Sequence, residues 1–145
     1  RSRGLGDVYK RQHLPDTGTV FISVKDNDKA LVTEAARDLI DLGFNIVATS
    51  GTAAYLESKG IAVERVNKVN EGQPHIVDRM INGGVHLVFN TTEGVQSLKD
   101  SASIRRTALV HKIPYFTTLA ASRASVQAIR AQRDRDLSVR PLQSA

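Results

Sequence analysis

The chain has 145 residues, a length that fits one domain with a full hydrophobic core. Hydrophobic residues make up 41% of it, which excludes a largely disordered polypeptide. Because there is no cysteine, disulfide frameworks, thiolate metal sites and cysteine nucleophiles are excluded. No apolar run approaches the ~20 residues of a membrane-spanning helix and no signal peptide is evident, so we expect a cytoplasmic protein without membrane contact.

The formal net charge of +5 is concentrated at the two ends of the chain. Residues 1–12 and residues 123–145 each carry +3, which leaves −1 for residues 13–122. A nucleic-acid-binding domain would instead show a basic face with interleaved aromatic residues, so we expect no nucleic-acid partner. We interpret residues 1–12 as a non-native leader, residues 13–131 as the domain and residues 132–145 as a C-terminal tail.

Strand and helix signals alternate along the domain, and they predict ten elements. In chain order these are a strand at 19–24, a helix from Asp28 to Gly43, a strand at 44–48, a helix at 52–59 ended by Gly60, a strand at 62–66, a helix from Pro74 to about Asn82, a strand at 85–89, a helix from Asp100 or Ser101 to about Lys112, a strand at 115–117 and a helix from about Thr118. Strands that alternate with helices form βαβ units. The sequence therefore predicts a doubly wound α/β fold, with a five-stranded parallel sheet and helices on both faces.

Polar residues follow the second predicted strand, at Thr49-Ser50-Gly51-Thr52. In open parallel sheets, ligands bind outside the carboxyl ends of the strands. Gly51 would let the backbone approach a ligand closely, and the N-terminus of the next helix would attract an anion. The alternative is that Ser50 or Thr52 simply caps the helix while Gly51 makes the turn.

Two lysines favour the anion site. Lys29 lies in the first turn of its predicted helix, where a cation opposes the helix dipole, and Lys68 follows the third strand. Each alone also fits a solvated surface lysine, and Asn90-Thr91-Thr92, after the fourth strand, also fits a polar turn. Taken together these residues predict a phosphate pocket made of Lys29, Thr49, Ser50, Gly51, Thr52, Lys68, Asn90, Thr91 and Thr92. From it we expect Lys68→Ala and Thr52→Ala to weaken binding with little loss of fold stability.

The strand ends offer no clustered carboxylate pair for acid–base chemistry, and the four histidines lack metal-ligand spacing. We interpret His75 as a helix-start or interface residue and His86 as a strand residue with a satisfied ring. The sequence thus predicts binding without catalytic residues, metal or cofactor in this domain.

The stretches ATSGTAAYL, VNKVNEGQPHIVDRMINGGVHLVFNTTEG and IRRTALVHKIPYFTTL closely resemble the allosteric domain of bacterial carbamoyl phosphate synthetases. The resemblance spans about Gly18 to Ile129 and implies the methylglyoxal synthase-like fold. It implies binding of UMP, an inhibitor, and IMP, an activator, with phosphate contacts at Lys29, Thr49, Thr52, Lys68, Asn90 and Thr92. The family often has histidine where this chain has Ser50.

The same resemblance implies that Tyr115 and Thr117 contact the activator ornithine at the boundary with a synthetase domain, although Phe116 between them is aspartate in some relatives. The implied partners are the synthetase domains of a large chain and, through them, the glutaminase small subunit of a glutamine-hydrolysing enzyme. Such a domain would control the supply of carbamoyl phosphate to pyrimidine and arginine synthesis.

Two enzymes with related sequences are the alternatives, and a homo-oligomer is a further open alternative. A methylglyoxal synthase, a lyase acting on dihydroxyacetone phosphate, would have aspartates at the positions of Pro74 and Thr92. An IMP cyclohydrolase would have K-T-L-H-P where this chain has N-E-G-Q-P-H. Both departures favour the regulatory interpretation.

Overall fold

The structure is a computed structural model that describes residues 14–15, 17–68, 75–91 and 95–144, and for 95–100 and 136–144 it describes only the helical backbone. The elements in chain order are β1 (Gly18–Ser23), α2 (Asp26–Asp41), β2 (Phe44–Ala48), α3 (Ser50–Ser58), β3 (Glu64–Arg65), α4 (Ile76–Ile81), β4 (Leu87–Asn90), α5 (Val95–Val110), β5 (Tyr115–Phe116) and α6 (Leu119–Ser144). The predicted leader, Pro74 and Thr92 lie outside the described residues.

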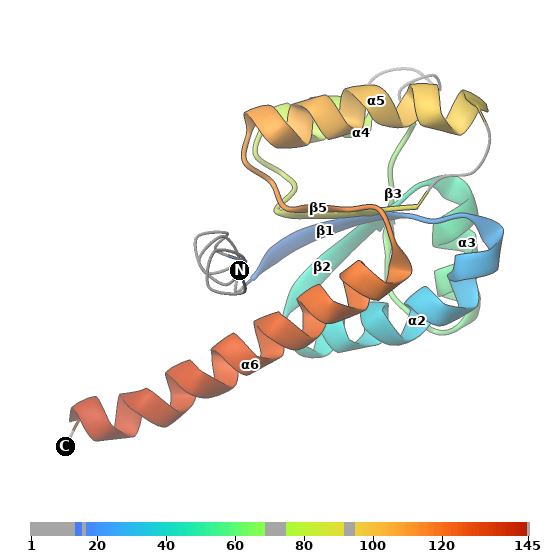
Figure 1. Ribbon diagram of the computed structural model, residues 1–145. Helices are drawn as coiled ribbons and strands as arrows, with labels where there is room; N and C mark the ends of the chain where they lie inside the picture. The colour runs from blue at the N-terminus through green and yellow to red at the C-terminus, as the bar shows by residue number, and fades with distance from the viewer. Residues whose placement is uncertain (1–13, 16, 69–74, 92–94, 145) are drawn as a thin grey trace, which may run out of the picture.

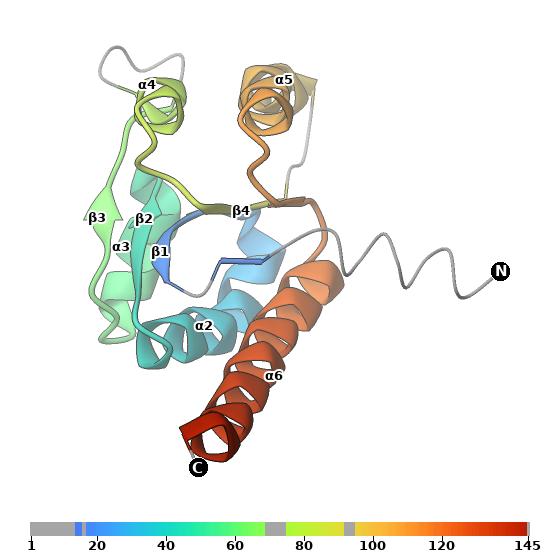
Figure 2. The ribbon, with the colours of Figure 1, turned by 90° about the vertical axis from the view of Figure 1, so that its left-hand side faces the viewer.

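The five strands form one sheet in the order β3-β2-β1-β4-β5, and every neighbouring pair is parallel. Helices α2, α3 and α6 cover one face, and α4 and α5 cover the other (Figures 1 and 2). This arrangement confirms the predicted doubly wound α/β fold. β1 lies at the centre, and the chain winds outward from it in both directions, first through β2 and β3 and then through β4 and β5.

The central strands are buried on both faces, which explains why their sequences are continuously apolar. Val20 and Ile22 of β1 face the core under α2, α3 and α6, while Phe21 between them faces the core under α4 and α5. All three side chains are fully buried. Because successive strand residues point to opposite faces, one strand supplies both cores.

Three of the helix ends are at the predicted glycines, whereas the helix starts agree less well with the prediction. Gly43, Gly60 and Gly83 all have positive φ, the conformation that ends helices at low cost for glycine. However, α2 begins at Asp26 with Lys25 as its N-cap residue, so the prediction that Asp28 caps it was wrong. The backbone N–H of Lys25 donates to Thr91 Oγ1, a contact from a distant segment that fixes the turn without a side-chain cap.

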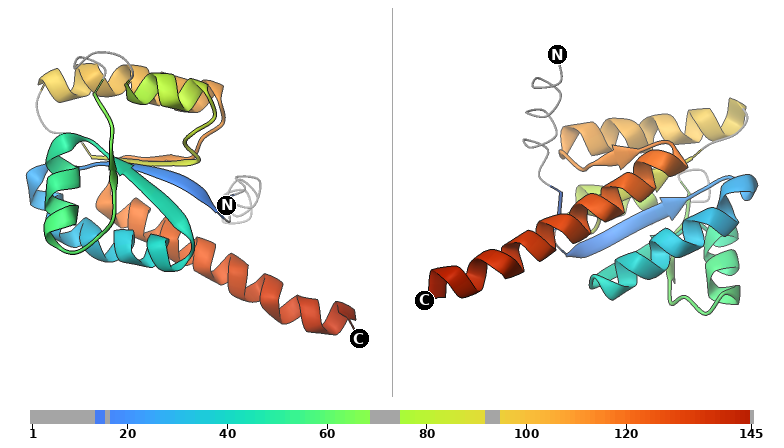
Figure 3. Two further views of the ribbon diagram at one scale, coloured as in Figure 1. Left: turned by 180° about the vertical axis from the view of Figure 1, so that it is seen from behind. Right: turned by 60° about the horizontal axis from the view of Figure 1, so that its bottom comes forward.

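Two more boundaries differ from their predictions. Helix α5 begins at Val95, ahead of the predicted cap at Asp100 or Ser101. Helix α6 continues to Ser144 through residues that the sequence analysis assigned to a tail. Its first half packs on α2, where Val126 and Ile129 are buried, and its second half projects away from the sheet (Figures 1 and 3).

Candidate functional site

The carboxyl ends of β1, β2 and β4 lie side by side, and we call this border of the sheet the carboxyl edge. Ser23, the last residue of β1, is in register with Asn90, the last residue of β4. On its other side, Ser23 Oγ lies 3.3 Å from Thr49 Oγ1, at the end of β2. Because the chain leaves β1 and β4 toward opposite faces, this is the topological switch point where such sheets bind ligands.

Three threonines of the predicted site are buried and tie the carboxyl edge together. Thr52 Oγ1 accepts a hydrogen bond of 3.2 Å from the backbone N–H of Val24, and Thr91 Oγ1 accepts one of 3.0 Å from that of Lys25. Thr49, Thr52 and Thr91 are at most 6% exposed. Since the backbone donates in the bonds of Thr52 and Thr91, those hydroxyl protons remain for other acceptors.

The N-terminus of α3 carries no side-chain cap. Its N-cap residue is Thr49, in an extended conformation and without a capping hydrogen bond. The alternative that Ser50 or Thr52 caps the helix was therefore wrong, because the Thr52 hydroxyl turns back to β1 instead. The first backbone bond of the helix joins Ala53 N–H to Thr49 O at 2.7 Å. The N–H groups that precede it face the carboxyl edge with the positive end of the helix dipole.

Lys29 lies directly over this helix terminus. A methyl group at Gly51 would meet Lys29 Nζ at 3.4 Å, so the absence of a side chain at Gly51 leaves the ammonium beside the backbone. Lys29 Nζ also donates to Asp26 Oδ1 at 2.6 Å. Through this hydrogen bond and its charge, the ammonium lowers the pKa of Asp26. Lys29, the cation that opposes the helix dipole in a first turn, is thus the fourth residue of α2 and forms an ion pair with the first residue, Asp26.

The amide nitrogen of Asn90 points away from the threonines, toward α5 and β5. Its Nδ2 donates to Ser101 Oγ of α5 and to Tyr115 Oη of β5, both at 2.9 Å, and the residue is 3% exposed. Asn90 of the predicted phosphate pocket and Tyr115 of the predicted interface are thus joined by one hydrogen bond. Ser23 and Ser101 were not among the predicted site residues, although Ser23, the last residue of a buried strand, could have been found from its position alone.

The remaining predicted residues lie further out. Lys68 is exposed and follows β3, which is the edge strand beside β2. Thr117 is exposed at the end of β5. His75 begins α4, where its Nδ1 accepts from Asp78 N–H and its own N–H donates to Asp78 Oδ2, so its interpretation as a helix-start residue is confirmed.

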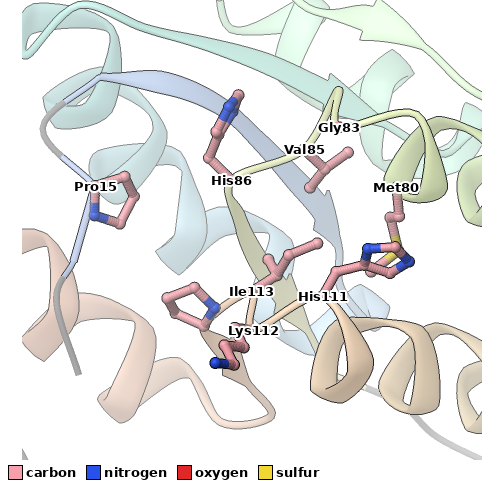
Figure 4. Close-up of a pocket in the computed structure, with 9 residues that line it drawn as sticks. Pro15, Met80, Gly83, Val85, His86, His111, Lys112 and Ile113 are labelled. Atoms are coloured by element: carbon pink, nitrogen blue, oxygen red, sulfur yellow. The ribbon is translucent and has the colours of Figure 1, made fainter. Parts of the chain in front are cut away.

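A hollow of about 420 Å³ lies at the opposite, amino edge of the sheet (Figure 4). His86 and His111 both line it, from the segments before β4 and after α5. β4 begins at Leu87, so the interpretation of His86 as a strand residue was wrong by one position. Its ring does have a partner, since His86 Nδ1 accepts from Thr19 N–H at 3.0 Å. Across the described ranges, no three His, Asp or Glu side chains come together as a metal site. Within those same ranges, no helix is long and apolar enough to cross a membrane.

Residues 31–117 match the model of the MGS-like domain family, and the chain belongs to that family. The match begins within α2 and ends just after β5, so it includes every strand except β1 but neither Ser23 nor Lys29. The fold is shared with a solved methylglyoxal synthase from Elizabethkingia anophelis NUHP1, at a TM-score of 0.63 and 20% identity over 78% of this chain and 79% of that one.

Much closer in sequence are carbamoyl phosphate synthase large chains. The chain is 56% identical to that of Pseudomonas syringae pv. tomato over 88% of its length, and 51% identical to that of Myxococcus xanthus over 90%. It spans only 13% and 12% of the length of these two relatives. The chain is therefore similar to one domain-sized segment of much longer chains.

Proposed function

We propose that this chain is an effector-binding domain of a carbamoyl phosphate synthase large chain, and that its carboxyl edge binds the phosphate of a nucleotide, UMP or IMP. The observation that carries the proposal is the position of Lys29 Nζ over the uncapped N-terminus of α3, beside Gly51. A mobile ammonium and free backbone N–H groups are together the usual means of binding a phosphate.

The buried threonines support the same site. The hydroxyls of Thr52 and Thr91 are already fixed by backbone N–H groups, so little conformational entropy would be lost when a ligand accepts their protons. Lys68, one strand further along the edge, would supply a second positive charge, and Ser50 and Thr92 would complete the pocket. At the end of β5, Tyr115 and Thr117 would contact ornithine at the boundary with a synthetase domain.

The larger context follows from the relatives. The remainder of a large chain would be the immediate partner, and a glutaminase small subunit the next. Nucleotide binding would shift the domain between two arrangements against its neighbour, with a coupling free energy of typically ~1–3 kcal/mol. In this way the domain would adjust carbamoyl phosphate supply to pyrimidine and arginine synthesis, and it would catalyse no reaction by itself.

A thermal-shift titration with UMP, IMP and inorganic phosphate tests the proposal. A ligand at ~100 times its dissociation constant stabilises the folded state by ~2.7 kcal/mol. The absence of a shift with all three ligands would refute the site, and sustained phosphate release from dihydroxyacetone phosphate would refute the non-catalytic role.

Lys29→Met locates the phosphate. Losing a charge-assisted hydrogen bond of about 1.5–3 kcal/mol should raise the dissociation constant for phosphate at least about tenfold. Lys59→Met is the matched control, because it removes the same charge at the far end of α3, where the ammonium lies 5.5 Å from the centre of the Tyr55 ring. Equal weakening in both variants would mean that only net charge matters and that the phosphate binds elsewhere.

A further inference from the structure

Asn90 connects three elements through one buried amide. Its Nδ2 donates to Ser101 Oγ on α5 and to Tyr115 Oη on β5, each at 2.9 Å. Both amide protons are used in this way, whereas Oδ1 takes no part in the two bonds. Asn90 also ends β4 beside Ser23, and the next residue, Thr91, holds Lys25 N–H. Asn90 is therefore part of the carboxyl edge and is hydrogen-bonded to β5.

The two hydroxyl partners can bond to either end of this amide. A serine or tyrosine hydroxyl both donates and accepts, whereas an amide donates through nitrogen and accepts through oxygen. If the amide rotated by half a turn, Oδ1 would accept from Ser101 and Tyr115, and no hydrogen bond to them would be lost. Nδ2 would then occupy the place that Oδ1 holds now. Which orientation is preferred depends on the group that faces the other end of the amide.

We propose that Asn90 is a positioning residue with two amide orientations, and that an anion at the carboxyl edge selects the orientation in which Nδ2 faces the ligand and Oδ1 accepts from Ser101 and Tyr115. This inference rests on the proposed phosphate site. Its physical basis is that an anion repels a carbonyl oxygen and attracts an N–H group. On binding, Tyr115 changes from acceptor to donor toward Asn90, so the end of β5 responds to the ligand without a backbone movement.

The phenol of Tyr115 reports the orientation. Burial raises its pKa, and the hydrogen bond donated by Asn90 and the charge of Arg105 on α5 both act in the lowering direction. A donor toward Tyr115 Oη stabilises the phenolate, whereas an acceptor stabilises the neutral phenol. Rotation of the amide removes the donor and supplies the acceptor. Phosphate binding should therefore raise the pKa of Tyr115 further.

The first experiment is a spectroscopic phenol titration of the whole chain, with and without saturating inorganic phosphate, from which the same titration of Tyr115→Phe is subtracted. An upward shift of the Tyr115 transition with phosphate is the expected result. If phosphate stabilises the protein but the transition stays in place or moves down, the amide does not rotate and the inference is overturned while the site stands. If phosphate gives no stabilisation, the site and the inference fail together.

A second measurement is the affinity of Tyr115→Phe for phosphate. If Tyr115 only supported the structure, its loss would weaken phosphate binding, whereas rotation of the amide predicts tighter binding. In Tyr115→Phe, the present orientation leaves one buried N–H of Asn90 without an acceptor, a costly state, whereas the rotated orientation leaves Oδ1 with one donor instead of two, which costs less. Phosphate should therefore bind this variant about threefold more tightly, or better. Tyr55→Phe, a tyrosine on α3, should bind as the parent does. Weaker binding by Tyr115→Phe alone would overturn the proposal.

Discussion

At the carboxyl edge of the sheet, buried hydroxyls form bonds across segments, whereas at the amino edge an exposed ring, that of His86, does so. Thr52 and Thr91 accept from backbone N–H groups just after β1, while His86 and His111 beside the amino-edge hollow are exposed. Buried hydroxyls that hold neighbouring loops fix the geometry of the carboxyl edge before any ligand arrives. Burial of the hydroxyls that form bonds across segments thus distinguishes the carboxyl edge, which is the candidate site.

Thr52→Val should produce the largest change, because it removes the acceptor for the buried N–H of Val24 while keeping the β-branched shape. An unsatisfied buried donor costs about 1–3 kcal/mol, and urea denaturation should show that loss. For Thr52 the structure thus replaces the expectation that truncation leaves fold stability nearly intact. Thr117→Val, at an exposed threonine, should change stability by at most about 0.5 kcal/mol. Equal denaturation midpoints for the two variants would contradict a structural role for the Thr52 hydroxyl.

At the amino edge, Lys112→Gly should stabilise the protein. Lys112 has a φ of 57° and ends α5 in a Schellman motif, in which Ile113 N–H donates to Ala108 O at 2.8 Å. Glycine adopts this conformation without strain, so a gain of about 0.5–1 kcal/mol is expected from thermal denaturation. Lys59→Gly is the opposite case, because Lys59 has a φ of −98°, where glycine adds disorder to the unfolded chain, and the change also removes the ammonium from the Tyr55 ring. A loss of stability in Lys112→Gly would show that its side chain makes a compensating contact.

The smallest effect is expected from Asp26→Asn. Because the pKa of Asp26 is lowered in the folded state, its carboxylate stabilises the fold at pH values above its unfolded-state pKa, and this stabilisation is lost as the pH falls through the folded-state pKa. The contribution is small because the carboxylate is fully exposed. The variant should therefore lose slightly less stability on acidification. It should also bind phosphate about twofold more tightly at low salt, because no carboxylate competes for Lys29. Asp41→Asn, at the amino end of the sheet, removes the same charge, and an equal gain there would contradict a local effect.

Local patterns predicted the elements well. The glycines at 43, 60 and 83 end helices because a positive φ is a property of the residue and its two neighbours. Apolar runs such as 44–48 predicted buried strands for the same reason, since burial on both faces leaves no alternation. Asp28 and Ser101 failed as predicted helix caps because contacts from distant segments and the preceding residues decide where a helix begins.

The candidate site was predictable only in part. The rule that ligands bind beyond strand ends was enough to select Thr49, Thr52 and Thr91, which the structure does bring together. The direction of each side chain was not predictable. Asn90 faces Tyr115, which lies 25 residues further along the chain, because β4 and β5 are neighbours in the sheet.

By itself, then, the sequence determined the fold class, most helix ends and which polar residues lie at the strand ends, because each depends on residues within one or two turns of the chain. Only the tertiary structure decided that Lys29 lies over Gly51, that the Thr52 hydroxyl holds β1 and that the Asn90 amide joins α5 to β5. Those contacts depend on the strand order β3-β2-β1-β4-β5, which is set by the packing of the whole chain.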